Sequence, residues 1–133
     1  MASRDLKNNI KIVNGLNIAS ITTNTTTGGE EVDTQGFESV TVVVMTGART
    51  DGTVTPLLQE SDVSGSYSGS VADENLIGLE ADAALSIAHG RARFAYIGNK
   101  RYIKPSFVST GVTTGLTAGI SVILGNPKSA PVA

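Results

Sequence analysis

The ten residues from Phe37 to Thr46 constrain the fold more than any other stretch, because they contain the longest β-branched run of the sequence. Side chains of a strand alternate between its two faces. One face of this stretch would carry Val40, Val42 and Val44, and the other would carry Phe37, Val43 and Met45. Both faces are apolar at the centre, so we predict a central strand of a sandwich or barrel that is covered on both sides. A buried helix is the alternative, and the valine and threonine content and the flanking Gly36 and Gly47 count against it.

Length and composition indicate one all-β domain. The chain has 133 residues, which is a common size for a single domain. Fifteen glycines, many threonines and few helix-favouring stretches are typical of short strands joined by turns. We therefore predict a jelly-roll-like antiparallel β-sandwich over residues 10–126, with at most one short helix near residues 80–88. An N-terminal arm over residues 1–9 and an extended C-terminal tail over residues 127–133 would flank it.

The composition also counts against several functions. Cysteine is absent, so disulfides and thiolate chemistry are excluded. Ten basic and twelve acidic side chains give a net charge of −2, which is not the electrostatic signature of a nucleic-acid-binding protein. The N-terminus lacks the apolar core of a signal peptide, and no apolar run approaches the roughly 20 residues of a membrane span. We expect a soluble protein that is made in the cytoplasm and stays there or is assembled there into something larger.

Turn-forming residues divide the rest of the chain into predicted strands. Asn14 and Gly15 form a strong turn signal that would separate two strands near the N-terminus. Arg91–Gly98 and Tyr102–Thr110 both alternate as strands, and the short connection between them predicts a β-hairpin. Ala118–Leu124 has the alternation of a last strand.

Two further segments carry local signals. Val54–Glu60 reads as a strand, and Pro56 cannot donate to a ladder, so we expect an edge strand or one that starts near Leu57. Glu80–Ala88 has helical propensity, and His89 followed by glycine would close a short helix there. A structured loop between the sheets is the alternative for this segment.

Three features resemble functional sites, and each has a plainer interpretation. Glu30, Glu31 and Asp33 could hold a metal ion, but they lack the spacing of a calcium loop, so a solvated sheet edge is favoured. The Gly65–Gly69 segment has tyrosine where a nucleophile elbow requires serine, which favours a surface loop. His89 could act as a base, but a lone histidine beside glycine more often caps a helix.

One part of the sequence is enriched in basic residues. Nucleic-acid binding is one interpretation, and a surface that pairs with acidic residues of another subunit is the other. The slightly negative net charge favours the second. These residues are Arg91, Arg93, Lys100, Arg101 and Lys104.

Four motifs, taken in order, resemble a family of small proteins of tailed bacteriophages that are usually found among the head genes. Some members of that family are similar to capsid cement or decoration proteins with a jelly-roll β-sandwich. The resemblance covers most of the chain from about Ile18 onward. The motifs are Asp33–Ser39, Asp51–Asp62, Tyr96–Ile103, and Leu124–Pro127 before Ala130–Val132.

The resemblance implies a structural virion protein that binds the outer surface of a phage capsid and stabilises the shell. It implies no catalytic residue, cofactor or metal. The expected partners are the major capsid protein and further copies of this chain, in a homodimer or homotrimer, but not nucleic acid, a membrane or a small-molecule substrate. The expected location is the capsid surface of a virion assembled in the host cytoplasm. From exposure and charge, the residues expected to contact a partner are Arg4, Lys7, Arg91, Arg93, Lys100, Arg101, Lys104, Pro127, Lys128 and Pro131.

Other functions remain open at this stage. A tail or head–tail connector component could have a similar sandwich. A receptor- or glycan-binding module is a further alternative, and the absence of tryptophan counts against it. An enzyme is not expected, because the chain has one histidine, no cysteine and no recognised catalytic motif.

Overall fold

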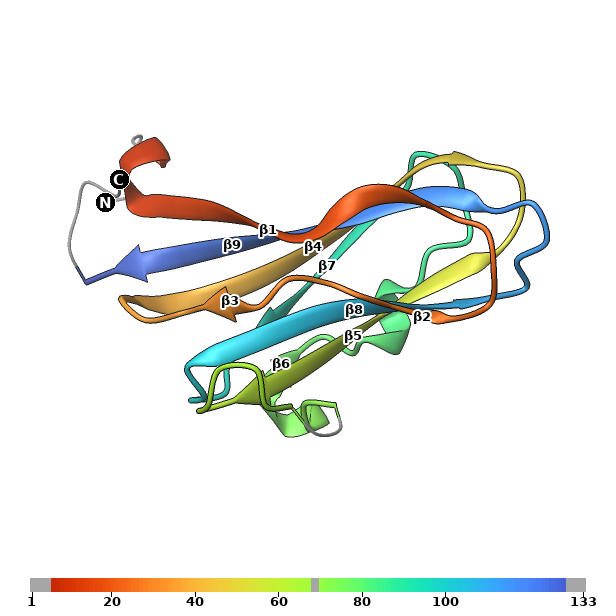
Figure 1. Cartoon of the computed structure of the whole chain (residues 1–133). Helices are drawn as coiled ribbons and strands as arrows, with labels where there is room; N and C mark the ends of the chain where they lie inside the picture. The colour runs from red at the N-terminus through yellow and green to blue at the C-terminus, as the bar shows by residue number, and fades with distance from the viewer. Residues whose placement is uncertain (1–5, 68–69, 129–133) are drawn as a thin grey trace.

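The computed structural model describes residues 6–67 and 70–128, which form two antiparallel β-sheets packed face to face (Figure 1). The five-stranded sheet has the order β1-β9-β4-β7-β6. Its strands are β1 (Ile10–Ile21), β9 (Leu116–Pro127), β4 (Phe37–Arg49), β7 (Arg91–Tyr96) and β6 (Leu76–Ile77). The predicted all-β antiparallel sandwich is confirmed.

The second sheet is built around β8 (Tyr102–Thr110). The long strand β5 (Thr53–Ser61) pairs with β8 along its whole length. The short strands β2 (Thr26–Gly28) and β3 (Val32–Asp33) therefore share the opposite edge of β8. That edge is interrupted between β2 and β3, beside Pro105, which has no N–H to donate to a neighbouring strand.

The described residues form no α-helix, and the only helical elements among them are short 3-10 turns. One of these, Ala81–Ala83, is the short helix expected near residues 80–88. His89 lies well beyond its end, so the prediction that His89 caps a helix is wrong. Instead, His89 has a left-handed backbone (φ 55°), and its N–H donates to the carbonyl of Gly47 at 2.9 Å. The other 3-10 turns are Lys7–Asn9 and Asp73–Asn75.

β4 occupies the middle of the five-stranded sheet, between β9 and β7, as predicted. Val42 and Val44 face the second sheet and are fully buried. On the other side of the strand, Val43 is half-buried and Met45 is 38% exposed. The prediction that both faces are covered is therefore wrong, because the second sheet packs on one face only. An antiparallel sheet can leave its other face in contact with water.

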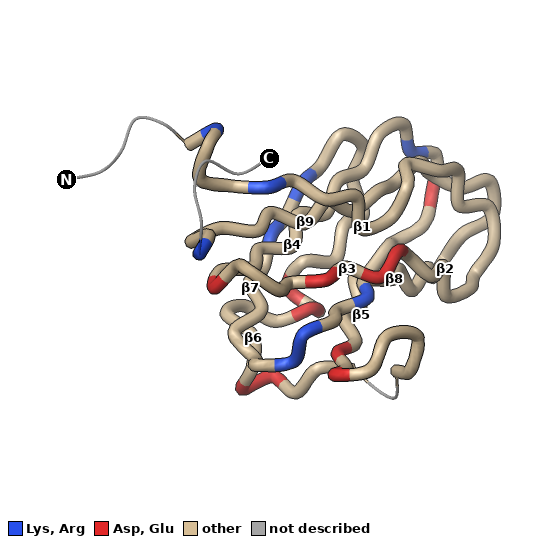
Figure 2. Tube along the Cα trace, turned by 60° about the vertical axis from the view of Figure 1, so that its left-hand side comes forward, with Lys and Arg blue, Asp and Glu red and all other residues tan. Residues whose placement is uncertain are grey.

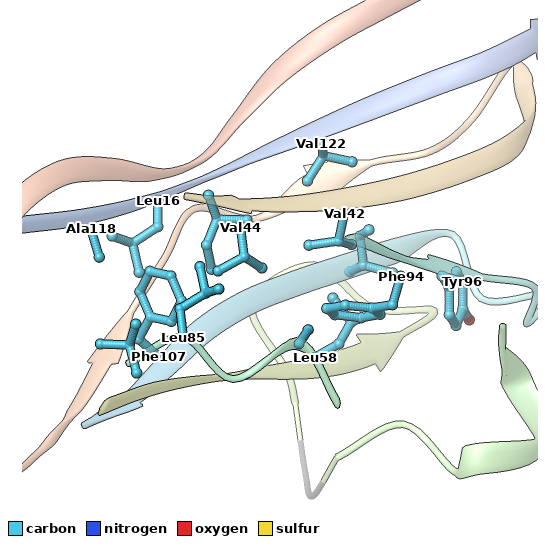
Figure 3. Close-up of a cluster of buried hydrophobic side chains, with 14 of the residues drawn as sticks. Leu16, Val42, Val44, Leu58, Leu85, Phe94, Tyr96, Phe107, Ala118 and Val122 are labelled. Carbon is cyan, nitrogen blue, oxygen red and sulfur yellow. The ribbon is translucent and has the colours of Figure 1, made fainter. Parts of the chain in front are cut away.

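The core lies between the two sheets and is made by the inward-facing residues of both (Figure 3). From the five-stranded sheet, Val42, Phe94 and Val122 point into it. From the second sheet, Leu58 and Phe107 meet them and are fully buried. Burial of these large apolar side chains is the main stabilising term of the fold.

The predicted hairpin of residues 91–98 and 102–110 is wrong, because the two segments belong to different sheets. β7 pairs with β4 and β6, whereas β8 pairs with strands of the second sheet. Residues 97–101 cross from one sheet to the other. Gly98 allows this crossing, since a Cβ there would come within 2.6 Å of the Tyr96 ring. Alternation shows that a strand has an inner face but not which sheet it joins.

The predicted turn at Asn14 and Gly15 is also wrong. β1 runs without a break through both residues, and its pairing with β9 shifts register there, as at a β-bulge. A Cβ on Gly15 would lie 2.9 Å from Cγ of Pro105 in the other sheet. The glycine therefore permits a close approach of the two sheets rather than a chain reversal.

β5 is an edge strand, as its proline predicted, although it starts at Thr53 rather than near Leu57. The backbone of Val54 exchanges hydrogen bonds with Leu85, and the carbonyl of Leu58 accepts from Val71 N–H at 2.8 Å. Pro56 lies between these two points on the same edge, where no donor is required. The last strand is longer than predicted: β9 spans Leu116–Pro127.

Candidate interaction surface

A row of side chains that is apolar except at the half-buried Thr41 crosses the uncovered face of the five-stranded sheet. The strand registers place Ile12 beside Ile123, Ile123 beside Thr41, Thr41 beside Ala95, and Ala95 beside Ile77. Ile12 is 65% exposed and Ile77 is 62% exposed. Single exposed apolar residues are ordinary, but a contiguous apolar patch marks an interaction site. We call this surface the outer face; it consists of Ile12, Asn14, Ile18, Thr41, Val43, Met45, Ile77, Arg91, Arg93, Ala95, Gly119, Ser121 and Ile123.

Two arginines give the outer face a positive side. In the β4–β7 register, Arg91 lies beside Met45 and Arg93 beside Val43. Both arginines are exposed, and neither is ion-paired with a carboxylate among the described residues. On the described strands of this sheet the one carboxylate is that of Glu38, an exposed residue at the other end of β4 from Met45. Acidic segments lie instead along the β3 edge of the second sheet and in the loops beside it (Figure 2). The outer face thus combines apolar side chains with a few neutral polar ones, Asn14, Thr41 and Ser121, and carries unpaired positive charge.

A hollow of about 260 Å³ lies at one end of the outer face. Ile18 and Met45 line it with the backbone of Gly119, and His89 and Arg91 also line it. A Cβ on Gly119 would lie 2.8 Å from Cγ1 of Ile18, so the glycine is what lets Ile18 lie across β9. The shape of the hollow therefore depends on the absence of a side chain at Gly119.

The loop beside this hollow is held by Thr46. Its hydroxyl donates to the carbonyl of Ile87 at 2.7 Å and accepts from Gly90 N–H at 2.9 Å. The N–H of Thr46 donates in turn to the carbonyl of Gly90 at 2.9 Å. These bonds, together with the bond from His89 to Gly47, fix the loop against β4.

The structure separates the basic residues that lie together in the sequence. Lys100 and Arg101 are in the crossing between the sheets and are paired within the chain. Nζ of Lys100 lies 3.0 Å from Asp62, and the Arg101 guanidinium donates to both carboxylate oxygens of Asp33 at 2.9 and 2.8 Å. Lys104 lies on the second sheet, with its Nζ 5.9 Å from the centre of the Tyr67 ring. Only Arg91 and Arg93 of this group lie on the outer face.

The remaining predicted contact residues lie near the ends of the chain. Lys7 is in the first 3-10 turn, and Pro127 ends β9. Pro127 and Lys128 line a shallow hollow together with Leu6, so the two described ends of the chain lie side by side. Arg4 and Pro131 fall outside the described residues.

The acidic cluster holds a loop in place. The Glu31 carboxylate accepts from the hydroxyl of Ser64 at 2.6 Å, the N–H of Gly65 at 2.7 Å and the hydroxyl of Tyr67 at 2.6 Å. These hydrogen bonds, that of Ser64 foremost, lower the pKa of Glu31. Among residues 6–67 and 70–128, no group of three or more metal-ligating side chains could hold a metal ion. The Tyr67 hydroxyl, at the centre of the elbow-like segment, acts here as a hydrogen-bond donor.

Asp51 holds a second loop, which the turn signal at this position did not indicate. Its carboxylate accepts from the backbone N–H groups of Thr113, Thr114 and Gly115 at 2.9–3.1 Å. These bonds lower the pKa of Asp51. They tie the β4–β5 connection to the β8–β9 connection at one end of the sandwich.

Because these carboxylates accept hydrogen bonds in the folded state, we expect the fold to lose stability at low pH. Hydrogen bonds from Arg101 to Asp33 and from Lys100 to Asp62 also lower the pKa of each of those carboxyls. A carboxyl with a lowered folded-state pKa contributes stability that is present above its unfolded pKa and is lost as the pH falls through the folded one. The urea midpoint should therefore fall as the pH is lowered from about 5 to about 2. Asp51→Asn should show a smaller fall.

Glu80 has the opposite pH dependence and serves as the internal control. Burial raises the pKa of Glu80, so the stability linked to this carboxyl is present when it is protonated and is lost as the pH rises through the raised pKa. Glu80→Gln should therefore steepen the loss of stability on acidification. A urea midpoint that does not change between pH 5 and pH 2 would contradict this assignment of the loop carboxylates.

No family model matches the sequence, and no curated protein matches it. Among solved structures, the crystal structure of SPBc2 prophage-derived protein YomS is similar, with a TM-score of 0.48 and 15% identity over 87% of this chain and 93% of that chain. A likeness this distant does not establish a shared function. No helix in the described part of the chain is long and apolar enough to cross a membrane.

Proposed function

We propose that this protein is a structural component of a tailed-bacteriophage particle that binds the outer surface of the capsid and stabilises the shell. The observation that carries the proposal is the outer face, where a row of side chains that is apolar except at Thr41 crosses all five strands and ends in the exposed Ile12 and Ile77. The assignment to phage and capsid comes from the four sequence motifs.

The outer face is large enough for a stable contact. Strands lie about 4.8 Å apart and extend about 3.4 Å per residue. β1, β9 and β4 have 12, 12 and 13 residues, whereas β7 has six and β6 two, so the sheet covers roughly 700 Å². This area is close to what each partner contributes to a standard protein–protein interface. A rigid sheet also loses little conformational freedom on binding.

Binding of this kind suits a protein that is present in many copies on one particle. Each copy needs only a modest affinity, because a protein that bridges neighbouring shell subunits adds its contacts over the whole lattice. The protein would then act through contact area rather than through bond-making.

The direct test uses shells assembled from the major capsid protein of the phage that encodes this chain. The purified protein should co-sediment with the shells and raise the temperature at which they rupture. Shells without the added protein provide the control. A failure to co-sediment, or binding confined to tails or necks in electron micrographs, would contradict the proposal.

A further inference from the structure

We propose, on the basis of the proposed function, that the hollow on the outer face receives an apolar side chain of the shell protein that lies next to a carboxylate. The hollow lies among Ile18, Met45 and Gly119, with Arg91 and His89 also lining it. The partner is thus a protein segment with two neighbouring features: an apolar anchor and an acidic group.

The apolar half of this inference rests on exposure and shape. Ile18 is 71% exposed and Met45 is 38% exposed, and both line a concave site rather than a flat surface. An anchor side chain placed in such a hollow would remove both from water, and contacts of this kind dominate interface energies. Because Thr46 and its hydrogen bonds fix the neighbouring loop, the hollow exists before the partner arrives.

The acidic half rests on unpaired charge. Arg91 lines the hollow, Arg93 lies two residues further along β7, and neither has an ion pair within the described residues. By contrast, Lys100 and Arg101 of the same chain are both paired. A guanidinium binds a carboxylate with two parallel hydrogen bonds, which is the geometry left open here.

The charge of the outer face also favours an acidic protein partner over a second copy of this chain and over nucleic acid. A second copy docked through the same face would bring two further arginines to the hollow, because the exposed carboxylate of this sheet, Glu38, lies at the other end of β4 from Met45 and Arg91. Nucleic acid is bound mainly by many phosphate contacts, and this face offers two arginines around an apolar centre on a chain of net charge −2. An apolar protein surface with acidic residues on one flank fits both features.

The experiment measures the affinity of full-length variants for the capsid shells by co-sedimentation. We expect Arg91→Glu and Ile18→Gln each to weaken binding by about tenfold. Arg91→Lys should weaken binding by a smaller factor, because lysine keeps the positive charge but cannot form two parallel hydrogen bonds. The matched controls are Lys104→Glu, which makes the same charge change on the other sheet, and Val63→Gln, at a loop residue that is 63% exposed. Both controls should bind within about twofold of the unchanged protein.

The outcomes separate this inference from the proposed function. If the unchanged protein binds and Arg91→Glu and Ile18→Gln bind equally well, the hollow is not the docking site, while shell binding stands. If the unchanged protein does not bind, both proposals fail. Competition by an excess of duplex DNA would indicate a nucleic-acid site instead. A dimer in sedimentation equilibrium that Arg91→Glu abolishes would indicate that a second copy occupies the face; either result overturns the inference.

Discussion

Replacing Gly29 with alanine should lower the free energy of unfolding by about 3–5 kcal/mol. A Cβ at this position would lie 2.2 Å from the carbonyl oxygen of Gly15 and 2.4 Å from that of Pro105. Both atoms are backbone, so no side chain can move aside to make room. The N–H of Gly29 donates to the Pro105 oxygen at 2.9 Å, and the N–H of Glu30 donates to the Gly15 oxygen. Relieving the clash would break both bonds where the two sheets meet.

The neighbouring residue provides the matched control. A Cβ on Gly28 would meet nothing closer than Cε of Lys104 at 4.0 Å, the flexible end of a side chain. Gly28→Ala should therefore change the stability by less than about 1 kcal/mol. Urea denaturation of both variants, followed by circular dichroism, measures the difference. Equal stabilities for the two variants would show that the sheets do not meet at Gly29 as described.

Replacing Phe107 with alanine should cost a similar 3–5 kcal/mol, or roughly 10–20 °C in melting temperature. Phe107 is fully buried, and its ring lies between the sheets near Leu85 and Leu16 (Figure 3). The loss combines the transfer of the aromatic ring out of the core with the cavity that it leaves behind. For a domain whose total stability is about 5–15 kcal/mol, this loss is a large fraction of the total.

The next residue on the same strand distinguishes loss of core packing from general damage to β8. Val108 is half-buried and points to the opposite side of the strand from Phe107. Val108→Ala should cost about 1 kcal/mol or less, measured by the same thermal and urea melts. Comparable losses for the two substitutions would contradict the placement of the core between the sheets.

Local patterns in the sequence correctly predicted the strands whose alternation is strong. The valines of residues 40–44 predicted both the strand β4 and its central position in a sheet. Pro56 predicted that β5 lies at an edge. The same patterns could not predict which strands pair, since alternation is identical whether β7 and β8 share a sheet or face each other. The role of Gly15 was also hidden, because a bulge beside a close-packed proline and a tight turn both require glycine.

The outer face was only partly predictable for the same reason. Alternation along β4 correctly placed Val43 and Met45 on one face. Because both faces of β4 were expected to be covered, these two residues were predicted to be buried. Ile12 and Ile77 join that face through strand registers that the sequence does not specify. The basic residues of positions 91–104 looked like one cluster, yet the crossing between the sheets sends them to three different surroundings. Charge proximity in sequence is therefore a poor guide to a surface when a chain changes sheets.

The most direct test of adhesion through the outer face is a cryo-electron microscopy reconstruction of capsid shells saturated with this protein. We predict sandwich-shaped density on the shell exterior, with the β1-β9-β4-β7-β6 sheet turned toward the capsid and β5 and β8 turned toward solvent. Density with the β5–β8 sheet against the capsid, or no density on the shell, would contradict it.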